Sequence, residues 1–207
     1  MTITASLLAY LAAASLLTIT PGVDSALVLR AATVEGTRQA TMGALGINLG
    51  CLFWGIAVAL GLGALIVTSP AAYEVLTWLG AGYLVWLGVQ LFFSPRRHLV
   101  NESGETGSGR FAWFWRGLFG NLLNPKVGVF YVSFLPQFVP QGVAVAPYTL
   151  LLALIHIALG LIWCALLIVA TRPLGRALRR PKVIAFLDRL TGTVFIGFGV
   201  KLALSAR

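Results

Sequence analysis

The chain has 207 residues, of which 58% are hydrophobic and 10% are charged, with a formal net charge of +9 and a mean hydropathy of +0.90. Because a soluble domain carries about a quarter charged residues, this composition excludes a water-soluble globular protein, and it excludes disordered and fibrous classes as well. The sequence therefore predicts an all-α polytopic membrane protein.

Six stretches are apolar over at least the roughly 20 helical residues that a bilayer crossing needs: 5–29, 41–68, 71–93, 112–139, 146–170 and 183–205. The first has no Lys or Arg before it, so we expect a retained span, with a removed signal peptide as the alternative. Asp188, Arg189 and Thr191 stand near the start of the sixth stretch and leave a five-span arrangement open.

Basic residues gather in alternate connections of the chain. The segments 30–40, 94–116 and 172–189 hold twelve of the fifteen Lys and Arg residues, whereas the connections 68–71 and 140–146 hold none. The positive-inside rule places the three basic segments in the cytoplasm and both termini in the periplasm. The net charge thus indicates topology and attraction to the anionic lipid bilayer, and no nucleic-acid partner is expected because no basic stripe alternates with exposed aromatic residues.

A polar, Gly/Ser-rich stretch divides the chain into two halves. Residues 94–111 are predicted to form a flexible cytoplasmic loop between a first three-helix repeat, 1–93, and a second, 112–207. Gly88-Val89-Gln90-Leu91 near the end of span three matches Gly199-Val200-Lys201-Leu202 near the end of span six. Three spans per half is an odd number, so the halves must lie in opposite orientations. The sequence predicts a 3+3 inverted repeat, which is typical of secondary transporters.

Spans one and four are both expected to be broken helices. Thr20-Pro21-Gly22-Val23-Asp24 interrupts the first, and Asn121-Leu122-Leu123-Asn124-Pro125-Lys126 interrupts the fourth. Proline cannot donate the helical hydrogen bond, so the carbonyls of Leu17 and Asn121 lose a partner and must face protein, water or ligand. Thr20 and Asn124 are predicted to cap restarted helices, with the prolines at the first helical position.

Each break also places an ionisable side chain at membrane depth, Asp24 in the first and Lys126 in the second. Such groups mark transport pathways or structural charge pairs. In the functional interpretation, Lys126 and the restarted amides hold a substrate carboxylate, while Asp24 or the freed carbonyls hold an ammonium group or a coupling proton. The alternative is a permanent Asp24–Lys126 salt bridge between spans one and four.

The predicted substrate-binding residues include the uncharged members of both breaks and two polar residues elsewhere. In full the predicted set is Asp24, Lys126, Asn124, Pro125, Pro21, Gly22, Asn121, Asn48 and His156. For Asn48 in span two and His156 in span five, an interhelical hydrogen bond explains the residue equally well. Gly43, Gly46 and Gly50 share one helical stripe, which is expected to let a neighbouring helix approach closely. No metal and no cofactor are predicted.

At these residues the chain resembles the LysE/RhtB family of bacterial amino-acid exporters, over nearly its whole length. The matching positions are the Thr20-Pro21-Gly22 break with Asp24, Arg30 and Gly36, the stretch Leu79 to Gly88, and, most specifically, Gly117, Asn121, Leu122, Asn124-Pro125-Lys126, Phe130, Phe134, Leu135-Pro136 and Gln137-Phe138 within Phe114 to Pro140. The resemblance implies an inner-membrane exporter of amino acids or their derivatives, driven by a proton or cation gradient. The first break commonly reads Pro-Gly-Pro in the family, and Val23 departs from that pattern.

Two other functions are alternatives to export. A membrane thiol–disulfide electron carrier needs two cysteines close together near the breaks, whereas Cys51 and Cys164 stand in spans two and five and are expected to lie away from Pro21 and Pro125. A divalent-metal exporter needs clustered His, Cys or carboxylate ligands, which the spans do not supply. The scarcity of acidic residues in the spans favours a neutral substrate. The particular amino acid, the coupling ion and a homodimeric assembly are left open.

Overall fold

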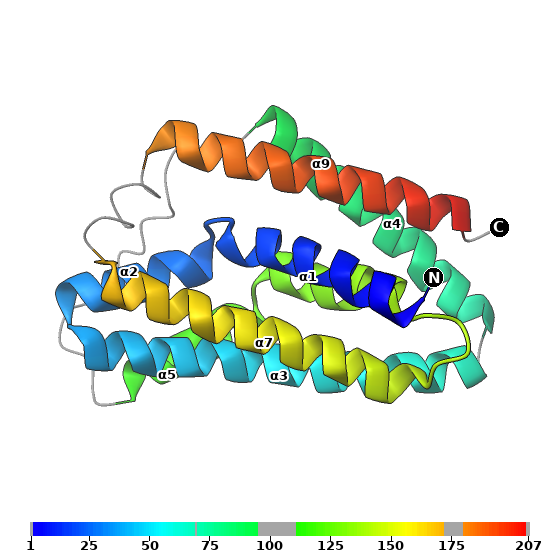
Figure 1. Ribbon diagram of the computed structural model, residues 1–207. Coiled ribbons are helices and arrows are strands. Elements are labelled where there is room, and N and C mark those ends of the chain that lie inside the picture. The colour runs from blue at the N-terminus through cyan, green and yellow to red at the C-terminus, as the bar shows by residue number, and fades with distance from the viewer. Residues whose placement is uncertain (1, 69, 95–110, 172–179, 206–207) are drawn as a thin grey trace.

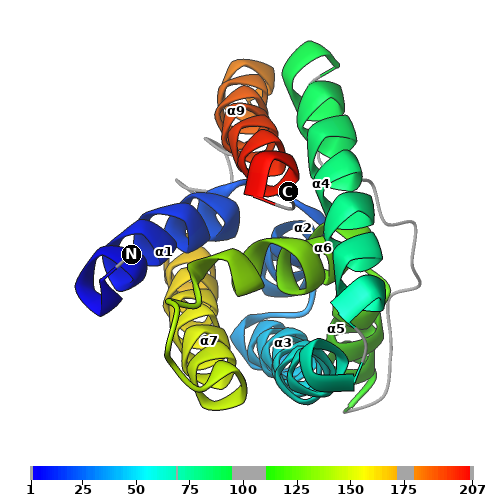
Figure 2. The ribbon, with the colours of Figure 1, turned by 90° about the vertical axis from the view of Figure 1, so that its right-hand side faces the viewer.

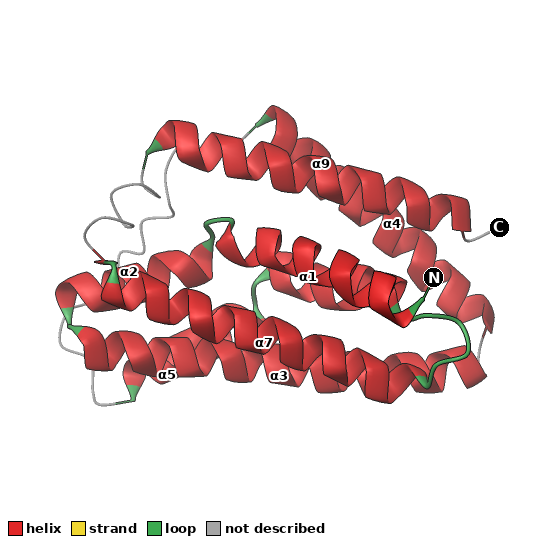
Figure 3. Cartoon of the chain, in the orientation of Figure 1, coloured by secondary structure: helices red, strands yellow, loops and turns green. Residues whose placement is uncertain are grey.

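The computed structural model describes residues 2–68, 70–94, 111–171 and 180–205, and these residues form helices joined by short turns (Figures 1 and 3). The elements are α1 (Ile3–Ile19), α2 (Val23–Val34), α3 (Thr37–Thr68), α4 (Pro70–Phe93), α5 (Ala112–Leu122), α6 (Pro125–Val129), the π-helix η1 (Phe130–Phe134), the 3₁₀-helix η2 (Leu135–Phe138), α7 (Val145–Val169) and α9 (Pro181–Ser205). The predicted all-α class is confirmed.

The helical segments coincide with the six predicted apolar stretches. Within the described residues, Thr37–Gly61 and Val145–Val169 are long and apolar enough to cross a membrane, and α1 with α2 is a third such segment if the pair forms one span. The axes of α1 and α2 differ by 51° at their break. The count of six spans stays a prediction, and nearly all of the predicted flexible loop, 94–111, lies outside the described residues.

The first break has a different cap from the predicted one. The structure places Thr20 at the C-terminal end of α1, where its hydroxyl donates to the Leu16 carbonyl at 2.7 Å. The same hydroxyl lies 2.6 Å from the Thr191 hydroxyl of α9. Helix α2 begins only at Val23, with Gly22 as its N-cap. The prediction that Thr20 caps a helix starting at Pro21 is therefore wrong, because the Thr20 hydroxyl is used by α1 and α9.

The second break follows the prediction. Helix α5 ends at Leu122, and α6 starts at Pro125 with the Asn124 side chain accepting a hydrogen bond from the Lys126 backbone N–H at 3.1 Å. Downstream of α6 the chain widens into the π-helix η1 and then tightens into η2 around Pro136. Neither change was predicted. Local π-helical turns are rare and occur often at functional sites.

The helices form a bundle in which α6 and the segments after it lie in the middle (Figure 2). The side chains of Phe130, Tyr131 and Phe134 are fully buried there, together with Tyr10 of α1. Helices α4 and α9 run antiparallel and pack mainly against each other, along one side of the bundle (Figure 1). Both chain ends lie at one end of the bundle, opposite the turn between α2 and α3, where Gly36 adopts a positive φ of 91°.

Helices α3 and α5 approach each other so closely that only glycine fits between them. A methyl group built on Gly46 would overlap the Phe114 carbonyl, and one built on Gly117 would overlap the Gly43 carbonyl. The predicted role of Gly43 and Gly46 in close packing is confirmed. The contact fixes the depth of α5, and therefore of the second break, relative to α3.

This contact predicts that Gly117→Ala destabilises the protein by about 1–3 kcal/mol, because the added methyl group forces two backbones apart. Gly120→Ala is the matched control in the same helix, since no atom lies within 4 Å of a methyl group at that position. It should leave stability unchanged or raise it by about 0.5–1 kcal/mol through helix propensity. Unfolding of both detergent-purified variants measures the difference, and equal stability of the two would contradict the close contact.

Candidate functional site

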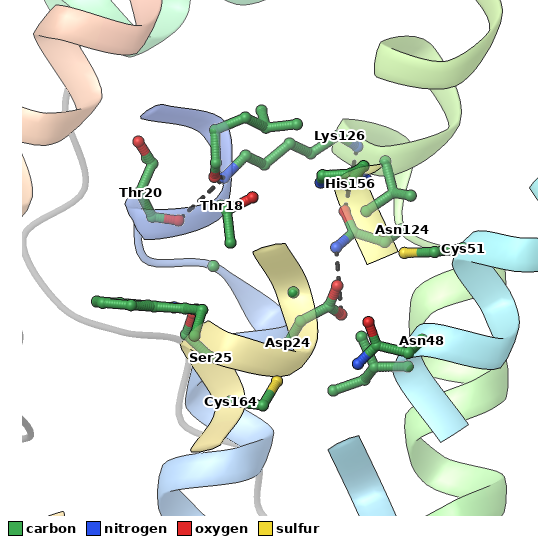
Figure 4. Close-up of a pocket in the computed structure, with 16 residues that line it drawn as sticks. Thr18, Thr20, Asp24, Ser25, Asn48, Cys51, Asn124, Lys126, His156 and Cys164 are labelled. Carbon is green, nitrogen blue, oxygen red and sulfur yellow. Dashed lines mark hydrogen bonds between the residues drawn. The ribbon is translucent and has the colours of Figure 1, made fainter. Parts of the chain in front are cut away.

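The two helix breaks meet at one pocket, which has a volume of about 70 Å³ (Figure 4). This is room for several water molecules at about 10–15 Å³ each. The lining residues come from α1, α2, α3, α6, α7 and the breaks: Leu17, Thr18, Thr20, Gly22, Asp24, Ser25, Ile47, Asn48, Cys51, Asn124, Lys126, Val127, His156, Gly160, Trp163 and Cys164. The structure thus brings Asp24 and Lys126, 102 positions apart in the numbering, into the wall of the same cavity.

The Asp24 carboxylate of the first break is held by two asparagines of the second. The Asn121 side-chain amide donates to one carboxylate oxygen at 2.9 Å, and the Asn124 amide lies 3.5 Å from the other. Asn124 therefore serves both as the cap of α6 and as a contact of Asp24. The Asp24 side chain is half-buried, so its carboxylate needs hydrogen-bond donors in place of the water it has lost, and the two amides supply these donors.

The Lys126 side chain makes the reciprocal connection. Its Nζ donates to the carbonyl of Leu17 at 3.2 Å and to the carbonyl of Thr20 at 3.0 Å. The Leu17 carbonyl is the one that Pro21 cannot satisfy, because proline has no N–H. The prediction that this carbonyl must face protein, water or ligand is confirmed, and its partner is the charged side chain of the other break.

Six of the nine predicted site residues line the pocket: Asp24, Gly22, Asn48, Asn124, Lys126 and His156. Pro21 and Asn121 belong to the breaks but are not among the lining residues. Asn121 is fully buried and touches Asp24 instead, which makes it a positioning residue. Whether any of these residues binds a substrate stays a prediction.

The alternative role of His156 as an interhelical contact is also observed. Its Nδ1 lies 3.0 Å from the Tyr131 hydroxyl, which joins α7 to η1. Asn48 donates from its side-chain amide to the Ala44 carbonyl of its own helix at 2.8 Å. Both side chains still face the pocket.

The expectation that the cysteines lie away from the breaks is wrong. Cys51 and Cys164 are free thiols that both line the pocket, and the Cys51 Sγ lies 3.5 Å from the Asn121 side-chain nitrogen. Their positions in spans two and five give their place along the chain but not the direction in which each helix turns its faces. Helix α3 turns the face bearing Cys51 toward the second break.

Helical periodicity indicates which further residues share a face with the predicted Asn48 and His156. Ile47 and Cys51 are four residues apart on α3, beside the predicted Asn48. On α7 the overlooked Gly160, Trp163 and Cys164 follow the predicted His156 at four, seven and eight positions, which places all four on one helical face. Trp163 donates from its indole N–H to the Ser25 hydroxyl at 3.3 Å, so this face also contacts α2.

A helical protein in which two broken apolar helices enclose a charged pocket has the architecture of a membrane transporter. The family model for LysE type translocators matches residues 15–206, so the chain belongs to this family. The predicted family resemblance is therefore confirmed, and the protein is a multi-pass membrane protein.

Three similar proteins cover almost all of the chain. The homoserine/homoserine lactone efflux protein of Salmonella typhi is 32% identical over 200 residues, which are 96% of each chain. The leucine efflux protein of Klebsiella pneumoniae subsp. pneumoniae is 29% identical, over 95% of this chain and 93% of the relative. The membrane protein YrhP of Bacillus subtilis is 29% identical over 208 residues, 97% of this chain and 99% of the relative. No solved structure matches this chain.

The contact between Asp24 and Asn121 predicts non-additive effects on stability. Asn121→Ala should cost about 1.5–3 kcal/mol, because the half-buried Asp24 carboxylate loses a charge-assisted hydrogen bond from a buried donor. In an Asp24→Asn background the same substitution should cost less, with a coupling energy on the order of 1 kcal/mol.

Unfolding of the wild type, both single variants and the double variant in one detergent measures the coupling. Gln90→Ala, at an exposed position near the end of α4, is the control for loss of a side-chain amide. Its effect on the free energy of unfolding should simply add to that of Asp24→Asn. Strict additivity of Asn121→Ala and Asp24→Asn would contradict the positioning role of Asn121.

Proposed function

We propose that this protein is a secondary transporter that exports amino acids or small amino-acid derivatives across the bacterial inner membrane by alternating access, coupled to a proton or cation gradient. The observation that carries the proposal is the meeting of Asp24 and Lys126, one from each helix break, in a single pocket. Ionisable side chains at membrane depth mark transport pathways. The similar proteins of Salmonella typhi and Klebsiella pneumoniae subsp. pneumoniae are named as efflux proteins for homoserine and its lactone and for leucine.

The charges of the pocket suit a zwitterion. Lys126 binds the substrate carboxylate, and Asp24, oriented by Asn121 and Asn124, attracts the substrate ammonium or carries the coupling proton. The pocket offers one charge of each sign, so each end of a zwitterion has an opposite charge to meet. The net charge of a zwitterion is zero, so its binding leaves the total charge of the pocket unchanged. Asn48 and His156 add polar contacts from α3 and α7.

The rest of the pocket wall favours a neutral side chain. Ile47, Val127 and Trp163 give it apolar surface, and Asp24 is the single carboxylate among its described lining residues. A dibasic amino acid would need a second acid for its side chain. The names of the two efflux relatives, which mention leucine, homoserine and its lactone, fit the same class of neutral substrate.

The packing of α4 against α9 supports the 3+3 inverted repeat. A methyl group built on Gly88 would meet Gly192 and Ile196, and one built on Gly199 would meet Ala81 and Val85. The shift that aligns Gly88 with Gly199 also aligns Ala81 with Gly192 and Val85 with Ile196. Each glycine therefore packs against the repeat equivalents of the residues that the other one contacts, as a two-fold axis between antiparallel helices requires.

The proposed topology has six spans, with the broken pairs α1–α2 and α5–η2 each counted as one. Both chain ends lie at one end of the bundle (Figure 1), which agrees with an even number of crossings. The positive-inside rule then places the termini in the periplasm. In alternating access, the repeats would move around a site that stays near the middle of the membrane.

Export of radiolabelled amino acids from cells that express the protein tests the function. A panel containing leucine, homoserine, threonine and lysine should show export of a neutral member. Lys126→Ala and Asp24→Asn should each lower export at least about tenfold, because each removes a charged contact worth about 1.5–3 kcal/mol. Lys182→Ala and Glu74→Gln, both at exposed positions, are the matched controls and should transport normally.

The place of the cysteines in the pocket makes the thiol–disulfide alternative worth testing in the same assay. A Cys51→Ala/Cys164→Ala double variant should retain export, because neither thiol supplies a charge for the substrate. Complete loss of activity in a stably inserted double variant would favour redox chemistry over the proposed transport.

The proposed topology predicts that both termini are periplasmic. Alkaline phosphatase, which is active only outside the cytoplasm, should be active when it is fused after Arg207. A green fluorescent protein fusion at the same position, which needs the cytoplasm, should stay dark. The reverse pattern in these two fusions would exclude an even number of spans with external ends.

A further inference from the structure

The Lys126 ammonium lies where two backbone carbonyls converge. Its Nζ donates to the carbonyls of Leu17, in the last turn of α1, and of Thr20, the first residue of the first break. Pro21 offers no N–H to the Leu17 carbonyl. Thr20 has an extended backbone between α1 and α2. Both carbonyl oxygens are therefore directed to one point at the edge of the pocket, and a side chain from the other half of the protein reaches across to that point (Figure 4).

The chemistry of this point is selective. It combines two carbonyl acceptors, and the Asp24 carboxylate lines the same pocket. A primary ammonium has three N–H donors and no acceptor, so it matches such a place, whereas a carboxylate or an N-acylated amine does not. In an apolar surrounding, a bare pair of carbonyls is costly, and Lys126 removes that cost while no ligand is bound.

We propose that the carbonyls of Leu17 and Thr20 form the ammonium site of the transporter, and that Lys126 occupies this site until a substrate ammonium replaces it. The displaced Lys126 Nζ then pairs with the substrate carboxylate. This inference rests on the proposed export function and defines its substrate class: molecules that carry an unblocked primary ammonium next to a carboxylate.

The exchange makes the pocket selective against simple amines. Lys126 is a tethered competitor, and a short tether gives an effective concentration on the order of millimolar. A zwitterion offers the displaced lysine a carboxylate in return. A lone amine offers nothing and adds a second positive charge to a poorly solvated site, which is unfavourable.

The test uses a ligand without a carboxylate. n-Butylamine, fully protonated at neutral pH, is titrated against the detergent-purified full-length protein, and its dissociation constant is taken from the rise in Tm with concentration. In Lys126→Met this constant should be at least about tenfold lower than in the wild type, because the competitor is gone. Lys182→Met removes a lysine at an exposed position and should behave as the wild type.

A gain of affinity for n-butylamine confined to Lys126→Met supports the exchange, and equal constants in Lys126→Met and wild type overturn it. Tetramethylammonium, which has no N–H donor, should show no gain, and an equal gain would overturn the assignment of the carbonyls. If Lys126→Met does not insert into the membrane, Lys126→Gln takes its place and should show a gain in the same direction.

The outcome is separable from that of the export assay. If no amino acid is exported but Lys126→Met binds n-butylamine more tightly, the ammonium site stands and the proposed function fails. If a neutral amino acid is exported but the affinity for n-butylamine does not change, the proposed function stands and the exchange at Lys126 is wrong.

Discussion

The hydrogen bond between the Lys126 ammonium and the Leu17 carbonyl is the interaction on which the site depends. Pro21 leaves this carbonyl without a helical donor, and a carbonyl without a partner is costly at membrane depth. The lysine that satisfies it is itself a half-buried charge and is stabilised by an anion nearby, which Asp24 supplies in the same pocket. Asp24 in turn needs donors, and Asn121 and Asn124 supply them. A single proline thus leads, step by step, to a closed set of contacts between the two breaks.

Small residues make this set of contacts possible. A methyl group on Gly50 would lie 2.6 Å from the Asn121 side-chain oxygen, and one on Gly160 would lie 2.7 Å from the Asn48 oxygen. Glycine at these positions gives the polar side chains the space that an ordinary helix surface would fill. Helix α3 therefore contributes to the site in two ways, by accepting α5 at close range and by leaving room at Gly50 for the Asn121 amide that faces Asp24.

What the sequence could predict is the chemistry that acts within a few residues. The missing N–H of Pro21 or Pro125 removes a hydrogen bond to the carbonyl four residues earlier whatever surrounds it, and Asn124 caps α6 because its own side chain reaches the N–H two residues on. The cap at Thr20 was mispredicted because its hydroxyl has a competing partner on α9, 171 positions away. Helical spacing puts Cys51 and Cys164 on the faces of Asn48 and His156, but whether those faces turn toward the breaks depends on how whole helices rotate and pack, as does the π-helix η1.

The proposed repeat is symmetric in its scaffold but not in its chemistry. The shift that aligns Pro21 with Pro125 places Asn121 at the position of Leu17 and Asn124 at that of Thr20. One break therefore offers backbone carbonyls and a carboxylate, while the other offers amides and an ammonium. If the two halves exchange conformations during transport, the first break still offers carbonyls and a carboxylate, and the second still offers amides and an ammonium. A zwitterion would then keep one orientation from entry to release, because its two ends have partners in different halves.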